Sequence, residues 1–248
     1  MPSKNKNICP YCGKEKALRQ ANFFGHIIEA YIPTCSCQKD KEKEEKKEKA
    51  KNKTYEKIKK LMEKGNIGKR YYSASFKNFS KTPQNQSMYN ACIEFSESFK
   101  EGNNNGSGLY LYGGVGCGKT HLAVSILKRL VGLNKKVLIY KASGLYDEYR
   151  QTYAFSNDEN GDQFLKRLRK ADLLIIDDLG TDKFDDKFSL FLYKVIDARY
   201  NDMSPLVITS NFSFSQLTTV LDRRIIDRLQ AMCEEWSNTS ASYRAFIK

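Results

Sequence analysis

The chain has 248 residues, 40% of them hydrophobic, and 42 Lys+Arg against 29 Asp+Glu give a formal net charge of +13. This apolar content provides for a core and excludes wholesale disorder and collagen-like or low-complexity classes, while the charge favours polyanionic partners. No apolar run approaches the ~18 residues of a membrane span, and the first residues are polar. We therefore expect a cytoplasmic protein that is neither secreted nor membrane-bound.

The first 37 residues lack regular periodicity and hold four of the seven cysteines. Cys9 and Cys12 have Cys-x-x-Cys spacing, and Cys35 and Cys37 have Cys-x-Cys spacing. Four thiolates satisfy tetrahedral Zn²⁺, and a metal explains how so short a segment folds. We expect these four cysteines to bind zinc, with His26 as the alternative to one thiol. The redox alternative for the first pair lacks its βαβ context. The other thiols are expected to be inert: Cys92, Cys117 and Cys233.

A run of alternating lysine and glutamate follows at residues 38–64. Glu-to-Lys pairs four residues apart favour an exposed helix, which Gly65 and Gly68 then end. The charge excess is concentrated at this front part, because residues 1–64 hold 17 Lys+Arg against 9 Asp+Glu. The predicted organisation has three parts: a zinc-binding module at 1–37, a charged helical linker at 38–68 and one α/β domain at 69–248.

In the α/β domain, apolar strand-like runs alternate with helical patterns. Strands are predicted at 109–112, 136–140, 172–176 and 205–209. Helices are predicted at 120–131, from about 145 to 168, and at 188–200. Apolar strands separated by helices indicate a parallel sheet covered on both faces.

The segment between the first predicted strand and helix fits the phosphate-binding pattern G-x-x-x-x-G-K-[ST]. Its glycines let consecutive N–H groups curl around phosphates, and the helix N-terminus adds a favourable dipole. Lys119 is expected to reach the β- and γ-phosphates, and the Thr120 hydroxyl to bind Mg²⁺. The predicted nucleotide-binding residues are Gly113, Gly114, Val115, Gly116, Cys117, Gly118, Lys119, Thr120 and His121.

Two carboxylates end the buried strand predicted at 172–176. Asp177, at the tip of this strand, is expected to hold the Mg²⁺ shell directly or through water. Asp178 is expected to orient or polarise the attacking water.

The loop Gly113–Thr120, the strand Leu173–Asp178 and the sequence Thr209-Ser210-Asn211 resemble AAA+ ATPases in order and spacing. More narrowly, residues 69–248 resemble bacterial and phage helicase loaders of the DnaC and DnaI type. The supporting segments are Lys69-Arg-Tyr, Ser75-Phe-Lys-Asn-Phe79, Ile176-Asp-Asp-Leu-Gly180, Ile196-Asp-Ala-Arg-Tyr200, Ile225-Ile-Asp-Arg228 and Ser242-Tyr-Arg244. The resemblance implies a AAA+ P-loop core without a full C-terminal lid, and ATP with Mg²⁺ as cofactors.

The resemblance also implies roles for individual polar residues. Asn211 resembles the first sensor of the γ-phosphate or water, and Arg244 the second sensor, which contacts the nucleotide of its own subunit. Arg228 resembles the arginine finger that acts on ATP held by a neighbouring subunit, with Arg224 as its rival one helical turn earlier. The alternative for each arginine is an exposed helix cation. Asp178 stands where many AAA+ proteins have glutamate, which favours slow, DNA-stimulated hydrolysis.

The function implied by the resemblance is that of a helicase loader. Its zinc module would bind the replicative DNA helicase, and its ATP-bound core would form a homo-oligomer on single-stranded DNA. Two alternatives remain open: an IstB-type ATPase that regulates DNA transposition, and a small-molecule P-loop kinase, in which Asn211 and Arg228 have no such role. The zinc module favours the loader.

Residues 145–155 and 166–170 combine aromatic and basic side chains. This stretch resembles the loader helix that faces single-stranded DNA, where rings stack on bases and cations meet phosphates. In the alternative, Leu145 and Tyr149, four residues apart, belong to the core and residues 166–170 form a solvated face.

Overall fold

The computed structural model describes residues 7–24, 26–102, 105–154 and 158–243. It divides into two compact units, Met1–Tyr55 and Glu56–Lys248. Among the described residues, no helix combines the length and the apolar character that crossing a membrane requires.

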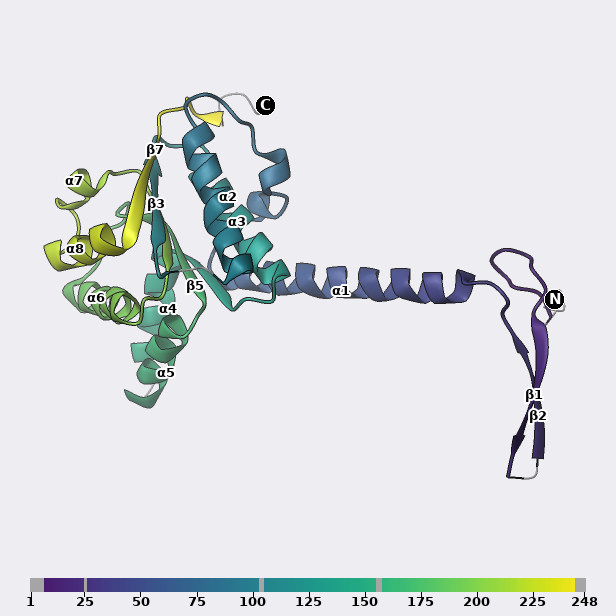
Figure 1. Ribbon diagram of the computed structural model, residues 1–248. Coiled ribbons are helices and arrows are strands. Elements are labelled where there is room, and N and C mark those ends of the chain that lie inside the picture. The colour runs from purple at the N-terminus through teal and green to yellow at the C-terminus, as the bar shows by residue number, and fades with distance from the viewer. Residues whose placement is uncertain (1–6, 25, 103–104, 155–157, 244–248) are drawn as a thin grey trace. The chain divides into compact units, whose positions relative to one another are not determined.

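The first unit contains a two-stranded antiparallel hairpin of β1 (Ala17–Phe23) and β2 (His26–Ile32) (Figure 1). Ala17 pairs with Ile32 at one end of the hairpin, and Phe23 pairs with His26 at the other. Every residue of β2 is exposed. A hairpin that buries so little apolar surface is marginal by itself, so this unit needs another source of stability.

Helix α1 (Cys37–Lys64) crosses the boundary between the two units. In its last turns, which belong to the second unit, Ile58 and Met62 are buried in a hydrophobic cluster. The charged repeat therefore gives way to an amphipathic end, because apolar residues four apart share one face of a helix.

The second unit is built on a five-stranded parallel sheet. In spatial order its strands are β4 (Val137–Lys141), β5 (Leu173–Leu179), β6 (Leu206–Ser210), β3 (Gly108–Gly113) and β7 (Cys233–Asn238). The predicted parallel sheet is confirmed. The edge strand β7 was not predicted, because its sequence Cys-Glu-Glu-Trp-Ser-Asn has no apolar run.

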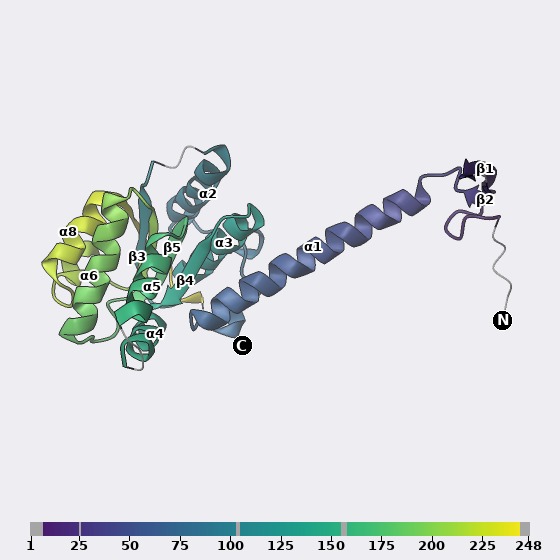
Figure 2. The ribbon, with the colours of Figure 1, turned by 90° about the horizontal axis from the view of Figure 1, so that it is seen from below.

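Helices cover both faces of this sheet (Figures 1 and 2). Helices α2 (Gln86–Glu101) and α3 (Lys119–Gly132) lie on one face, preceded by the short turns η1 (Lys69–Tyr71) and η2 (Phe76–Asn78). The opposite face carries the remaining helices: α4 (Ala142–Ala154), α5 (Asp158–Arg169), α6 (Asp186–Asn201), α7 (Phe214–Leu217) and α8 (Arg223–Met232). The helical stretch predicted from 145 to 168 is thus two helices, α4 and α5.

Arg199 of α6 is fully buried and ties several backbone segments together. Its Nη1 donates to the carbonyl oxygens of Leu168 (2.7 Å), Arg169 (3.1 Å) and Ala171 (3.0 Å), and its Nη2 donates to that of Pro205 (2.8 Å). One side chain therefore joins the end of α5 to the segments that lead into β5 and β6.

Replacing Arg199 with methionine should lower the free energy of unfolding by about 3 kcal/mol or more, because three buried carbonyl groups and one partly buried carbonyl group lose their donor. Denaturant unfolding checks this. Arg169→Met is the matched control: it removes an ion pair with Asp202 that is half exposed, and such pairs contribute at most about 1 kcal/mol. Equal losses in the two variants would contradict the role given to Arg199.

Candidate nucleotide-binding site and cysteine cluster

The phosphate-binding loop joins the end of β3 to the start of α3, as predicted. Two of its glycines occupy positions that a side chain cannot share. Gly113 has φ 146°, and a Cβ there would lie 2.1 Å from the carbonyl oxygen of Asn238. Gly118 has φ 103°, and a Cβ there would lie 2.7 Å from the Phe79 ring. The loop thus follows a path that only glycine permits at these points.

Lys119 lies at the centre of the loop and is 5% exposed. Its Nζ donates to the carbonyl oxygens of Gly113 (2.9 Å) and Gly114 (2.8 Å) and to Asn211 Oδ1 (3.0 Å). Asn211 follows β6, the strand next to β3. The fold therefore brings together a lysine and an amide that lie 92 positions apart in the sequence.

Asp177 is buried beside the loop and accepts hydrogen bonds from two threonine hydroxyls. Thr120 Oγ1 lies 2.9 and 3.1 Å from its two oxygens, and Thr209 Oγ1 donates to Oδ1 at 2.6 Å. Burial, assisted by the nearby Asp178 charge, raises the pKa of Asp177 to about 6, and the threonine bonds oppose this rise. Mg²⁺ prefers oxygen ligands, so the Thr120 hydroxyl and the Asp177 carboxylate fit the predicted ion.

Asp178, the next residue, lines the pocket over the phosphate loop and lies at an irregular point in β5. The pairing of β5 with β6 shifts register between Ile176 and Leu179, and Asp178 has φ 59°. Such a bulge interrupts the regular alternation of side chains between the two faces of the sheet. Asp177 is therefore buried, whereas Asp178 lines the pocket. Lys141 Nζ lies 3.8 Å from Asp178 Oδ2.

A cavity of about 320 Å³ lies over the loop. Besides the loop, Asp178 and Asn211, it is lined by a segment to which the sequence assigned no role: Arg70, Tyr71, Asn78, Phe79, Ser80 and Asn85. A nucleobase and ribose need such a wall next to the phosphates. The only sequence signal was the resemblance of residues 69–79 to loaders, which did not say what the segment touches.

His121 and the C-terminal segment also reach this pocket. His121 Nε2 lies 2.9 Å from the Ser75 carbonyl oxygen, and burial lowers the pKa of the ring. His121 thereby anchors the wall segment to α3. The Tyr243 N–H donates to the Gly116 carbonyl (3.0 Å), so the chain passes the phosphate loop at this point. The second-sensor candidate, Arg244, lies outside the described residues.

The four front-end cysteines gather in the first unit. The Sγ atoms of Cys9, Cys12, Cys35 and Cys37 all lie within 4.8 Å of one another, close to the edge of about 3.8 Å that a ZnS₄ tetrahedron requires. The donor set therefore fits Zn²⁺. His26 is not part of this cluster, since it lies at the far end of the hairpin, about 20 Å from Ile32 by strand rise.

Comparison with known proteins identifies the family of this chain. The sequence profile of the "IstB-like ATP binding protein" family matches residues 41–248. The chain belongs to this family. The "Replicative helicase loader DnaC" of Buchnera aphidicola subsp. Baizongia pistaciae is 26% identical over 181 residues, which cover 73% of this chain and 72% of that relative.

Solved structures confirm the AAA+ type of fold for this IstB-like protein. The crystal structure of the DnaC helicase loader superposes with a TM-score of 0.62 at 24% identity, covering 69% of this chain and all of that one. The crystal structure of DnaI gives 0.59 at 24% identity, covering 69% and 94%. The resemblance to ATP-binding proteins of the DnaC and DnaI type is thus confirmed at the level of the family.

The two arginine-finger candidates of this IstB-like protein lie on α8. Neither Arg224 nor Arg228 lines the nucleotide pocket of its own chain. A role toward a neighbouring subunit remains a proposal.

Leu145, Tyr146 and Tyr149 of α4 lie in or against the core. Leu145 is fully buried. The Tyr146 ring centroid lies 4.9 Å from that of Phe188, and the Tyr149 centroid lies 4.8 Å from that of Phe191. The core alternative is confirmed for Leu145, and Tyr149 packs against this core while it stays partly exposed. DNA contacts of this stretch stay a prediction. Phe155 lies outside the described residues.

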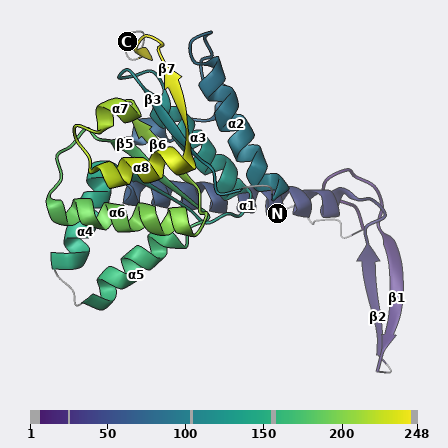
Figure 3. The same cartoon turned by 60° about the vertical axis from the view of Figure 1, so that its left-hand side comes forward.

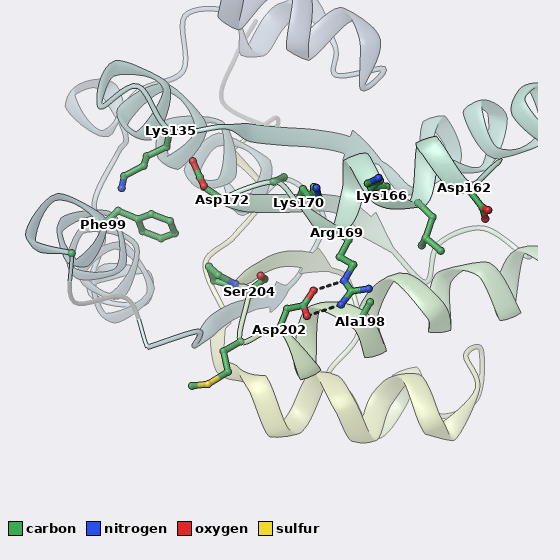
Figure 4. Close-up of a pocket in the computed structure, with 15 residues that line it drawn as sticks. Phe99, Lys135, Asp162, Lys166, Arg169, Lys170, Asp172, Ala198, Asp202 and Ser204 are labelled. Carbon is green, nitrogen blue, oxygen red and sulfur yellow. Dashed lines mark hydrogen bonds and ion pairs between the residues drawn. The ribbon is translucent and has the colours of Figure 1, made fainter. Parts of the chain in front are cut away.

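The basic residues at the end of α5 border a different hollow of about 780 Å³ (Figure 4). Lys166 and Lys170 lie on its rim, and Arg169 Nη2 pairs with Asp202 Oδ1 at 2.8 Å. The hollow includes Asp172 and Pro205, which immediately precede β5 and β6, whereas the nucleotide pocket lies where these strands end. Cations in a last helical turn complement the helix dipole, which accounts for these residues structurally.

Replacing Gly118 with alanine should weaken ATP binding roughly tenfold or more. The left-handed backbone and the Phe79 contact both oppose a methyl group, at an expected cost of about 1–3 kcal/mol in the binding-competent loop. Titration with a fluorescent ATP analogue measures the effect. Gly132→Ala, at the other end of α3 where a Cβ meets open space, should bind as the native chain does. Unchanged affinity in Gly118→Ala would mean that Phe79 moves aside freely.

Proposed function

We propose that this chain is an ATP-dependent helicase loader: its zinc module binds the replicative DNA helicase, and its nucleotide core helps place that helicase on single-stranded DNA. The observation that carries the proposal is the combination of a four-thiol cluster in its own unit with a nucleotide core whose relatives include replicative helicase loaders. In a transposition regulator or a small-molecule kinase, the thiol cluster would have no comparable role.

ATP would act as the switch. In the proposed site Lys119 contacts the β- and γ-phosphates, Thr120 and Asp177 hold Mg²⁺, and Asp178 polarises the attacking water. Asn211, already hydrogen-bonded to Lys119, would sense the γ-phosphate. Asp177 and Asp178 belong to β5 and Asn211 follows β6, so the residues proposed to contact the nucleotide are connected to the central strands of the sheet.

The hairpin of the zinc module offers a contact surface for the helicase. Its exposed side chains include the large apolar residues Leu18, Ile27, Ile28, Tyr31 and Ile32. Exposed apolar clusters of this kind mark protein contacts more often than nucleic-acid contacts, which rely on cations and accessible rings. We therefore assign helicase binding to the hairpin and DNA binding to the oligomeric ATPase core.

A loading assay tests this proposal. The cognate helicase is given a circular single-stranded DNA with an annealed oligonucleotide, and strand displacement is followed with and without the full-length protein and ATP. Faster displacement that requires ATP and Lys119 supports a loader. If displacement is unaffected while the protein stimulates strand transfer by a cognate transposase on duplex DNA, the transposition alternative is correct.

A further inference from the structure

Helices α6 and α8 lie side by side over the sheet (Figures 2 and 3). From α8, Arg228 Nε donates to Asp197 Oδ1 on α6 at 3.0 Å, and Nη1 donates to Asp227 Oδ2 at 3.0 Å. The guanidinium carbon also lies 5.0 Å from the centroid of the Tyr200 ring. In the part of the chain that the structure describes, Nη2 has no acceptor, so one end of the guanidinium is available.

Arg224 is arranged differently. Its Nε lies 3.2 Å from both Asp222 oxygens, and its Nη2 donates to Oδ2 at 2.7 Å. Asp222 also accepts the Arg224 N–H and caps α8. The Arg224 side chain is therefore folded back onto the N-cap of its own helix, and its guanidinium carbon lies 4.9 Å from the centroid of the Tyr193 ring on α6. Like Arg228, it keeps one guanidinium nitrogen, Nη1, without an acceptor among the described residues.

The α6 side of the Arg228 contact is itself fixed. Asp197 Oδ2 accepts from Asn201 Nδ2 at 3.1 Å, which leaves Oδ1 for Arg228. Asp197 and Tyr200 are three residues apart and share one helix face. The neighbouring Arg199 is buried and donates to four backbone carbonyl oxygens. These hydrogen bonds fix this turn of α6 to the core.

We propose that Asp197 and Tyr200 are positioning residues that hold Arg228 by its Nε edge and its ring face, leaving Nη2 to reach the γ-phosphate of ATP on a neighbouring copy. The inference rests on the proposed ATP switch and takes Arg228, whose carboxylate partner Asp197 lies on a second helix, as the trans-acting arginine. The Asp197 and Arg228 side chains are about one-third exposed, and such pairs add little stability. Their effect is on orientation, where small misplacements of a reacting group cost up to about 100-fold in rate.

The first test compares full-length Asp197→Asn with the native chain in DNA-stimulated ATP turnover at saturating protein. We expect turnover to fall about 10- to 100-fold, while ATP affinity and melting temperature stay unchanged. Asp222→Asn is the matched control: asparagine still caps the helix and only Arg224 loses its partner, so turnover should remain native. If Asp197→Asn has native turnover while Arg228→Ala is inactive, Asp197 does not position Arg228, although Arg228 itself is required.

Mixing experiments test the side of the interface on which Asp197 acts. Asp178→Asn subunits lack the catalytic carboxylate and keep Arg228, whereas Asp197→Asn subunits keep the carboxylate and lack a positioned arginine. Their mixture should recover turnover, because some interfaces combine both intact halves. A mixture of Asp197→Asn with Arg228→Ala should recover none. Recovery in that second mixture overturns the proposal.

The ring contact provides an independent variant. Tyr200→Phe keeps the face that Arg228 covers and should retain turnover, whereas Tyr200→Leu should lose about tenfold. Equal turnover in these two variants contradicts the part assigned to Tyr200. If Arg228→Ala itself turns over normally at every protein concentration, Arg228 is not a trans-acting arginine and this inference fails, whereas the proposed loader function is tested separately by the loading assay.

Discussion

Replacing Asp178 with asparagine is expected to lower ATP turnover about 100-fold or more while ATP affinity stays near the native value. An amide cannot take a proton from the attacking water, and general-base catalysis contributes about 10²–10⁴-fold. The backbone of residue 178 is left-handed, a conformation that asparagine tolerates, so the bulge should persist. Lys119 and Thr120, the proposed phosphate and Mg²⁺ ligands, are unchanged in this variant.

Phosphate release and nucleotide titration measured on the same preparation check this prediction. Asp177→Asn is the informative comparison, because it removes a proposed Mg²⁺ ligand and should weaken Mg²⁺-dependent nucleotide binding as well as turnover. Native turnover in Asp178→Asn would show that another group activates the water.

The second large effect is expected at the cysteine cluster. The double variant Cys35→Ser, Cys37→Ser should lose bound zinc and the ordered hairpin, because structural zinc contributes about 10–16 kcal/mol in small modules and the hairpin itself buries little. The second unit, Glu56–Lys248, should keep its melting temperature, since its cores contain none of these residues.

Metal analysis and limited trypsin digestion measure both consequences. We expect about one zinc per native chain and protection of Arg19, which lies in β1, and neither in the double variant. Cys92→Ala, at a buried thiol of the ATPase unit, should keep its zinc. A native chain without zinc, or an Arg19 that is equally protected in the double variant, would contradict the account.

The features that could be predicted from sequence are those whose chemistry requires particular residues at fixed spacing within a short segment. The phosphate loop needs glycines and Lys119 in fixed order, a buried parallel strand needs an apolar run, and a zinc module needs paired thiols. For these features a short window holds all the information, and the structure places the corresponding residues together.

The remaining features depend on contacts between distant segments. The edge strand β7 is polar and pairs only with β3, so no alternation reveals it. The wall formed by Tyr71 and Phe79 belongs to the pocket only because the chain before α2 crosses the loop. For Tyr149, spacing by four residues suits a core and a stacking platform equally, and only the structure shows that the ring packs against Phe191 of α6.

We propose above all that the zinc module binds the replicative helicase. The most direct test is capture of the cognate helicase by immobilised full-length protein in the presence of ATP. We expect capture by the native chain and by Lys119→Ala, which retains the module, and loss of capture after zinc removal or in the Cys35→Ser, Cys37→Ser variant. Capture that persists without zinc, or no capture by the native chain, would contradict this proposal.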